Sequence, residues 1–154
     1  MISDEYAAGF FDGEGCVNIT VGGKSRQVAL RVMIVNTDEA ILQAFMLRFG
    51  GRLSRPRTLT AGWKKFICLT LSGECAFKFL STICRYAILK RPQIELGMEF
   101  WEFQHSADRC IVVALGPAHT KGVRPFRRVR RPETVSKELA YKDMMHQFNK
   151  KGAA

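Results

Sequence analysis

Apolar residues recur at every second position in two neighbouring stretches near the start of the chain, residues 15–21 and 27–35. A period of two is typical of a strand that buries one of its faces. Glycine-rich residues 22–25 separate the two stretches, as expected for a tight turn. The pattern therefore predicts a β-hairpin in the first quarter of the chain.

Apolar residues at spacings of three and four predict five helices. Capping residues mark the first three starts: Ser3, then Asn36 or Thr37, then Ser72. Pro92 suits the first turn of the fourth helix, where its missing N–H costs no hydrogen bond. The predicted helices span about 4–12, 38–49, 73–87, 92–106 and 133–150.

A second hairpin is predicted between the second and third helices, with strands near residues 52–55 and 63–71. The order helix–hairpin–helix–hairpin–helix predicts an α+β fold, αββαββα, in which helices cover one face of four antiparallel strands. The other face points outward, and a polar or basic β-surface without acids can enter a DNA major groove. Its predicted side chains are Asn18, Thr20, Gln27, Arg31 and Lys65.

A chain of 154 residues is long enough for one domain with a real core. We expect a single domain over residues 1–154, with the α+β core at about 3–105. A basic loop and a C-terminal helix follow at about 109–152; residues 111–115 are apolar and ambiguous, and the basic stretch after them is expected to be a loop.

The composition is that of an ordinary globular protein, with 47% hydrophobic and 25% charged residues. No apolar run is long enough for a membrane span and no secretory signal is visible, so we expect an intracellular protein that uses no membrane. The five cysteines include no C-x-x-C pair, which argues against a disulfide framework or a structural zinc site.

The net charge of +10 favours a polyanionic partner, and the placement of the acids strengthens that inference. Segments 15–37, 40–73 and 109–132 contain lysines and arginines but no aspartate or glutamate. A mixed solvated surface would intersperse the two signs. Whole segments with cations alone are typical of a surface that binds nucleic acid.

Residues 7–15 are Ala-Ala-Gly-Phe-Phe-Asp-Gly-Glu-Gly. This stretch resembles the LAGLIDADG motif of homing endonucleases, with six of nine positions identical or conservative. The order of elements fits that family over roughly residues 3–105, and the C-terminal loop and helix look like the single-motif, chloroplast-intron-type branch. The resemblance implies a saddle-shaped sheet and a site-specific endonuclease that makes a double-strand break in a long, near-palindromic target by metal-dependent hydrolysis.

Gly9 and Gly13 are four residues apart, so they share one face of the first helix and leave its backbone bare. Two such helices can approach closely. We expect a homodimer, because one motif is present, with Ala8, Gly9, Asp12 and Gly13 at its interface. Glu14 then meets its symmetry mate at the two-fold axis, where its carboxylate and the Gly13 carbonyl suit Mg²⁺; Mn²⁺ or Ca²⁺ could occupy the same sites.

The resemblance implies two further catalytic residues. Asn36 matches a polar residue that positions water at the end of the second strand, although it could equally cap the next helix. Lys90 matches a lysine that stabilises charge on phosphate, the alternative being a solvated loop lysine. An arginine found in some relatives one helical turn beyond the polar residue is replaced by Ala40, and Arg91 or Arg31 could substitute for it. Asp12 is expected to cap the helix end or pair locally.

The expected partner is double-stranded DNA, with no small-molecule substrate. The alternative is a cleavage-impaired relative that acts as an intron-splicing maturase or as a DNA-binding protein, and its one sequence hint is Ala40. Such genes lie in introns, so the compartment is expected to be a chloroplast or mitochondrion or a microbial or phage-infected cytoplasm. The expected DNA contacts are Asn18, Thr20, Lys24, Arg26, Gln27, Arg31, Met33, Ser54, Arg55, Arg57, Lys65, Ile67, Lys121, Arg124, Arg127 and Arg128.

Overall fold

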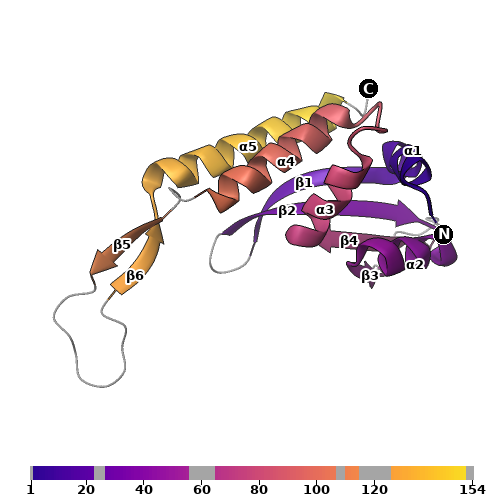
Figure 1. Ribbon diagram of the computed structural model, residues 1–154, viewed down its shortest axis with the longest axis horizontal. Coiled ribbons are helices and arrows are strands. Elements are labelled where there is room, and N and C mark those ends of the chain that lie inside the picture. The colour runs from indigo at the N-terminus through magenta and orange to yellow at the C-terminus, as the bar shows by residue number, and fades with distance from the viewer. Residues whose placement is uncertain (1, 23–26, 56–64, 107–109, 115–125, 152–154) are drawn as a thin grey trace, which may run out of the picture.

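The computed structural model describes residues 2–22, 27–55, 65–106, 110–114 and 126–151. Helices and strands follow the predicted order up to residue 105 (Figure 1). The elements are α1 Asp4–Glu14, β1 Gly15–Gly22, β2 Gln27–Asn36, α2 Glu39–Phe49, β3 Arg52–Ser54, β4 Ile67–Ser72, α3 Glu74–Ile83, α4 Arg91–His105, β5 Cys110–Ala114, β6 Phe126–Arg130 and α5 Pro132–Lys151.

The four-stranded sheet has the order β1-β2-β4-β3, and all neighbouring strands are antiparallel. The first hairpin is confirmed: β1 and β2 pair from Gly15 opposite Ile34 to Gly22 opposite Gln27. The α+β fold with four antiparallel strands and C-terminal helices is therefore confirmed. No helix among the described ranges is long and apolar enough to cross a bilayer.

The core lies between the sheet and the helices that cover it. Val17, Leu30, Val32 and Ile34 are fully buried there, as their period of two predicts. Helix α4 packs close to the sheet at Gly97, where an added Cβ would lie 3.1 Å from side chains of Leu80 and Val17 and 3.2 Å from Leu30. The opposite sheet face is largely uncovered: Gln27, Arg31 and Arg52 are exposed there, while Asn149 of α5 reaches Asn18 at the β1 edge.

The C-terminal part consists of a two-stranded hairpin, β5–β6, and the long helix α5. Helix α5 lies antiparallel beside α4 and reaches back to β1, while the β5–β6 hairpin projects from the body (Figure 1). The Tyr141 hydroxyl donates to Glu99 of α4 at 2.7 Å, and the Asn149 amide donates to the Val17 carbonyl at 2.9 Å. The latter bond satisfies a carbonyl on the sheet edge.

Several predicted boundaries are wrong. Strand β6 replaces part of the expected basic loop, and residues 111–114, which were ambiguous, form most of β5. Asp38 caps α2, because its side chain accepts the Ala40 N–H at 2.8 Å. Ser72 ends β4 instead of capping α3, which starts after Gly73 with positive φ and has no side-chain cap. Helix α3 ends at Ile83, and turns follow.

Candidate active site

Helix α1 starts at a Ser3 cap, whose hydroxyl accepts the Tyr6 N–H at 3.2 Å. One face of the helix is buried against the core through Ala7, Ala8 and Phe11. Ala8 therefore packs inside its own chain, and its predicted place at a dimer interface is wrong.

The opposite face of α1 is open. Gly9 and Gly13 are exposed, and a Cβ added at either position would meet no heavy atom of the described chain within 4 Å. A second helix could therefore approach the backbone here without displacing any side chain of this chain. This bare strip is what the spacing of the two glycines predicts.

Glu14 is the last residue of α1 and is exposed. The Gly15 N–H donates to the Phe11 carbonyl, so the carbonyls after Phe11 lie beyond the last intrahelical hydrogen bond. The chain turns directly from α1 into β1 at Gly15, where a Cβ would lie 2.0 Å from the Phe11 ring. Gly13 and Glu14 are therefore the last two residues of the helix before the chain enters the sheet.

Asp12 binds a distant loop. Its carboxylate accepts the backbone N–H groups of Ile88 at 2.7 Å, Leu89 at 3.1 Å and Lys90 at 3.0 Å. Hydrogen bonds to a charged group contribute roughly 1.5–3 kcal/mol each. With these three donors Asp12 is a structural acceptor, which agrees with the expectation that Glu14 and not Asp12 is available to a metal.

Lys90 is brought to the end of α1 by the same contact. Its ammonium group donates to the Asp12 carbonyl. The pKa of the nearby Cys16 thiol is raised by burial, and the Asn18 amide and the Lys90 charge offset part of that rise. Lys90 is therefore a half-buried cation between α1 and the start of β1, and the alternative of a freely solvated lysine is wrong.

Asn36 is the last residue of β2 and lies two residues beyond Ile34, the partner of Gly15. It therefore sits at the same end of the sheet as Glu14 and Lys90. Its side-chain oxygen accepts the Asp38 N–H at 2.9 Å, which leaves its amide NH₂ free of that role. Asn36 braces the turn before α2, while Asp38 caps the helix itself.

Neither of the two arginines that were expected to substitute at Ala40, Arg91 and Arg31, is placed to do so. Ala40 is exposed in the first turn of α2. Arg91 is engaged elsewhere, because it donates to the carbonyls of Ala87 and Arg85. Arg31 lies in the middle of β2 opposite Asn18, away from the end of the strand. Sequence reasoning had no signal for either placement.

The uncovered sheet face contains most of the expected base contacts that the structure describes. Asn18 lies opposite Arg31, and its amide group contacts Cys16 and Met33 while its oxygen accepts from Asn149 at 3.4 Å. This face of β1, β2, β3 and β4 contains no aspartate or glutamate. It includes Asn18, Thr20, Gln27, Arg31, Met33, Arg52, Ser54 and Thr70.

Ile67 does not belong to this surface. It lies in the buried core on the same side as Leu69 and Leu71, so its predicted DNA contact is wrong. Lys65 is exposed but precedes β4. Sequence reasoning missed Arg52 and Thr70, which pair with each other on the outward face. The buried alternation of Leu69 and Leu71 was the signal that could have identified Thr70.

The remaining expected DNA contacts lie off the four-stranded sheet or outside the described residues. Arg55 is exposed and pairs with Glu39 at 2.5 Å. Lys24, Arg26, Arg57, Lys121 and Arg124 lie outside the described residues. Arg127 and Arg128 lie on strand β6.

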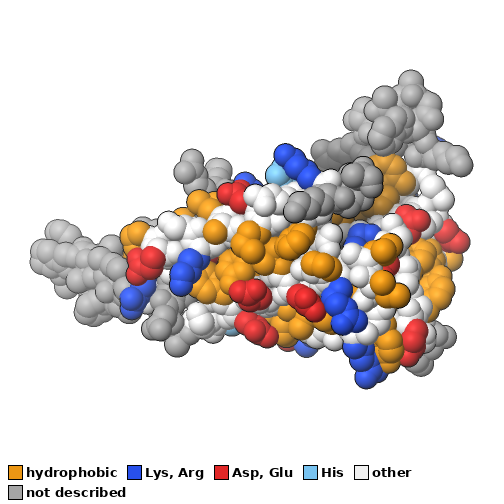
Figure 2. All heavy atoms as spheres, turned by 90° about the horizontal axis from the view of Figure 1, so that it is seen from above, with side chains coloured by type: hydrophobic (Ala, Val, Ile, Leu, Met, Phe, Trp, Pro, Cys, Tyr) orange, Lys and Arg blue, Asp and Glu red, His pale blue; other side chains and the backbone are white. Residues whose placement is uncertain are grey.

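The covered side of the molecule differs in charge pattern from the sheet face. On the surface of α4 and α5, acidic and basic side chains are interspersed, with apolar side chains between them (Figure 2). A side with mixed signs offers no continuous attraction to a polyanion. The acid-free sheet face is therefore the better candidate for binding nucleic acid.

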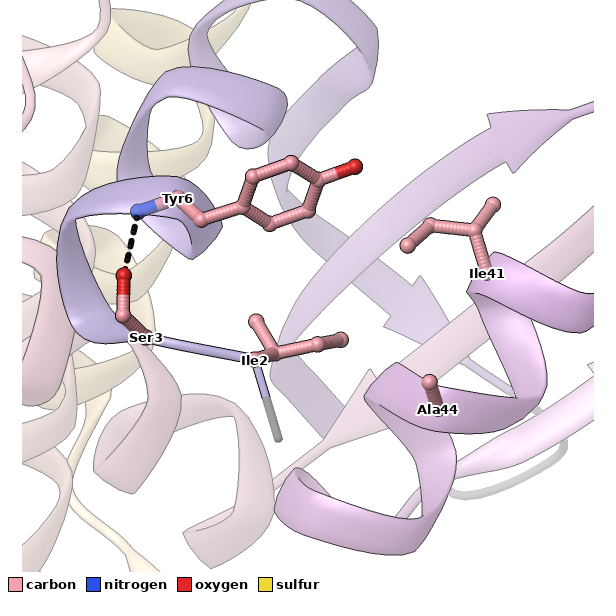
Figure 3. A pocket seen from close by; sticks show the side chains of 5 residues that line it. All are labelled: Ile2, Ser3, Tyr6, Ile41 and Ala44. Carbon is pink, nitrogen blue, oxygen red and sulfur yellow. Dashed lines mark hydrogen bonds between the residues drawn. The ribbon is translucent and has the colours of Figure 1, made fainter.

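A separate pocket of about 420 Å³ opens between the start of α1 and α2. Ile2, Ser3, Tyr6, Ile41 and Ala44 line it, and the Ser3–Tyr6 capping bond forms part of its wall (Figure 3). None of these described lining residues is a carboxylate, a histidine, a lysine or an arginine, and the pocket lies at the end of α1 away from Glu14. It is therefore distinct from the candidate active site.

The described residues of one chain form no complete metal site. Within the described ranges, no three His, Cys, Asp or Glu side chains come together in a way that could hold a metal ion. The donors at the end of α1 are one carboxylate, from Glu14, and the Gly13 carbonyl. Both are hard oxygen donors of the kind that Mg²⁺ and Ca²⁺ prefer.

The geometry matches that of known solved structures. The homing endonuclease I-CvuI, in complex with its target in the presence of Ca, aligns with 94% of this chain and 80% of its own, at 17% identity and a TM-score of 0.66. The archaeal intron-encoded homing endonuclease I-Vdi141I, complexed with DNA, aligns with 94% and 82% at 13% identity and a TM-score of 0.65. This chain has the LAGLIDADG homing endonuclease fold.

The homing endonuclease I-TnaI aligns over 97% of this chain and 97% of its own, at 14% identity and a TM-score of 0.60. Only 38% of the LAGLIDADG endonuclease I-GzeII aligns, with a TM-score of 0.53. No protein-family model and no curated protein sequence matches the chain. The similarity to the LAGLIDADG fold is thus one of structure at low sequence identity.

Proposed function

We propose that this chain is a site-specific DNA endonuclease of the single-motif LAGLIDADG type, which makes a double-strand break as a homodimer. One observation supports this above the others: exposed Glu14, half-buried Lys90 and Asn36 all lie at one end of a sheet whose described outward face contains no acid. The solved structures of I-CvuI and I-Vdi141I with DNA support the same reading.

A divalent metal would be held by the Glu14 carboxylate and the Gly13 carbonyl of each chain. The fit rests on the exposure of Glu14 and on the position of Gly13 beyond the last intrahelical hydrogen bond. A bound Mg²⁺ would lower the pKa of a water molecule and neutralise charge on the leaving oxygen. Since one chain offers a single carboxylate, the second would come from the partner copy.

Dimerisation would bring the bare faces of two α1 helices together at Gly9 and Gly13. Open space at both glycines supports this arrangement. The two Glu14 side chains would then lie near the two-fold axis, where their mutual repulsion requires a cation. The metal is therefore an electrostatic requirement of the proposed dimer.

The other site residues would act on solvent and phosphate. Lys90 would stabilise negative charge that develops on the scissile phosphate, because a half-buried cation is only weakly screened. The NH₂ group of Asn36 would orient a water molecule. Arg31 and Gln27 on the sheet would contact base edges in the major groove, and Arg52 would extend that surface toward β3.

The proposal is tested by selecting cleaved sites from a plasmid library with a randomised insert. We expect linear product with MgCl₂ present, none with EDTA, and a recovered site with approximate two-fold symmetry. Recovery of no cleaved sequence from a protein that binds DNA in a salt-dependent manner would overturn the enzymatic proposal.

That last outcome would favour the second candidate, a maturase or DNA-binding protein with the same fold. The specific observation in its favour is Ala40, exposed where some relatives place an arginine, with Arg31 and Arg91 both placed elsewhere. Binding of a structured intron RNA more tightly than of duplex DNA, in parallel titrations, would identify the maturase.

A further inference from the structure

The segment from Ile88 to Lys90 is held without any anchor of its own in the core. Ile88 and Leu89 are 81% and 73% exposed, so their side chains contribute little to fixing the backbone. Arg91 braces neighbouring carbonyls of the same turn region. Among the hydrogen bonds of the described residues, those that tie residues 88–90 to α1 all run to Asp12.

Asp12 also supplies what α4 lacks at its start. Lys90 occupies the N-cap position of α4, and no side chain of its own segment caps that helix. The Asp12 carboxylate accepts the Lys90 N–H instead, and a negative charge is favourable at a helix N-terminus. A residue of α1 thus sets the position at which α4 begins.

We propose that Asp12 is the positioning residue of the active site: it fixes the backbone of residue 90, so that the Lys90 ammonium is directed to the end of α1 beside Glu14. The inference rests on the proposed endonuclease function. Two hydrogen bonds fix the position of Lys90: its backbone N–H donates to the Asp12 carboxylate, and its ammonium group donates to the Asp12 carbonyl. A side chain anchored at both ends has few rotamers left.

The role of Asp12 is separated from a merely structural one by a double-mutant cycle. We expect Lys90→Ala to lower the single-turnover rate on the selected site by about 10²-fold. Asp12→Asn removes the carboxylate charge and offers NH₂ where an acceptor is needed, so it should cause a large part of the same loss while DNA affinity in EDTA is unchanged. In the Lys90→Ala background, Asp12→Asn should cause no further loss of rate.

Asp4→Asn is the matched control. Asp4 is the half-buried aspartate at the other end of α1, paired with Arg48, so its substitution should leave the cleavage rate unchanged. Multiplicative losses in the Asp12/Lys90 double variant would overturn the positioning role. So would a fall in DNA affinity equal to the fall in rate.

Backbone hydrogen exchange gives a readout that needs no cleavage, and the wild-type protein by itself can refute the clamp. In the wild-type protein the amides of residues 88–90 should exchange slowly despite their exposed side chains, and Asp12→Asn, but not Asp4→Asn, should accelerate them. Unprotected amides in the wild type would refute the clamp. Protected amides in a protein that cleaves no DNA would refute the endonuclease, and with it any catalytic use of Lys90.

Discussion

Two regions of the motif use the same residue type for opposite purposes. Gly9 and Gly13 lie on the outer face of α1, where an added Cβ would meet nothing within 4 Å. Gly15 lies just beyond the helix, at the extended first residue of β1, where a Cβ would overlap the buried Phe11 ring. A glycine of the motif is therefore understood from its place in the fold and not from its identity.

The two acids of the motif differ in the same way. Asp12 accepts three backbone N–H groups, while Glu14 extends from the helix end into open space. An acid whose lone pairs are occupied stabilises the fold, and one without such partners is available to a metal.

Glu14→Gln should lower DNA cleavage by about 10³-fold or more, because the amide keeps the shape of the side chain but removes the charge that would hold the metal. DNA binding in EDTA should be unchanged or slightly tighter, since a negative charge near phosphate is lost. The measurements are single-turnover cleavage and a fluorescence binding titration. Glu102→Gln, at an exposed position of α4, serves as the control, and wild-type cleavage by Glu14→Gln would disprove the metal role of Glu14.

Gly15→Ala should lower the free energy of unfolding by about 1–3 kcal/mol, because the new methyl group would overlap the buried Phe11 ring. Urea unfolding at a fixed protomer concentration measures this change. Gly22→Ala lies in the same strand and meets only ordinary contacts, 3.8 Å or more away, so it should change stability by much less. Equal effects at the two glycines would contradict the packing role of Gly15.

Gly9→Leu should leave the fold of the protomer intact and abolish the proposed dimer, because the side chain has room in one chain but would separate two α1 helices. Sedimentation at micromolar protein should shift from the dimer to the protomer. Glu102→Leu introduces the same side chain on exposed α4 and should leave the mass unchanged. A Gly9→Leu protein that stays dimeric would place the interface elsewhere.

The smallest effect is expected from Glu5, in the first turn of α1. Backbone N–H groups at the helix start, followed by the Tyr86 hydroxyl, lower the pKa of its carboxyl below the ordinary 4.5. The contribution to stability is therefore present above pH 4.5 and is lost as pH falls through the lower folded pKa. Glu5→Gln should slightly flatten the acid limb of a stability–pH curve; a steeper limb would contradict the direction of the shift.

The first hairpin could be predicted closely, since its eight residue pairs follow one uninterrupted period of two. The return strand of the second hairpin, β4, could not be predicted as closely. Lys65 and Ile67 were both expected to point outward, but Ile67 is buried on the same side as Leu69 and Leu71, so the assumed alternation was one residue out of phase. A one-residue change of phase reverses every side chain in a strand.

The sequence by itself determined α1, the first hairpin, the bare glycine strip and the acid-free sheet face, because each depends on residues within a few turns or strands of one another. Only the tertiary structure decided that Asp12 holds Lys90, from which it is separated by 78 positions. That contact exists because α3 and the turns after it return the chain to the end of α1. No local period encodes such a return, since it follows from how the whole core packs.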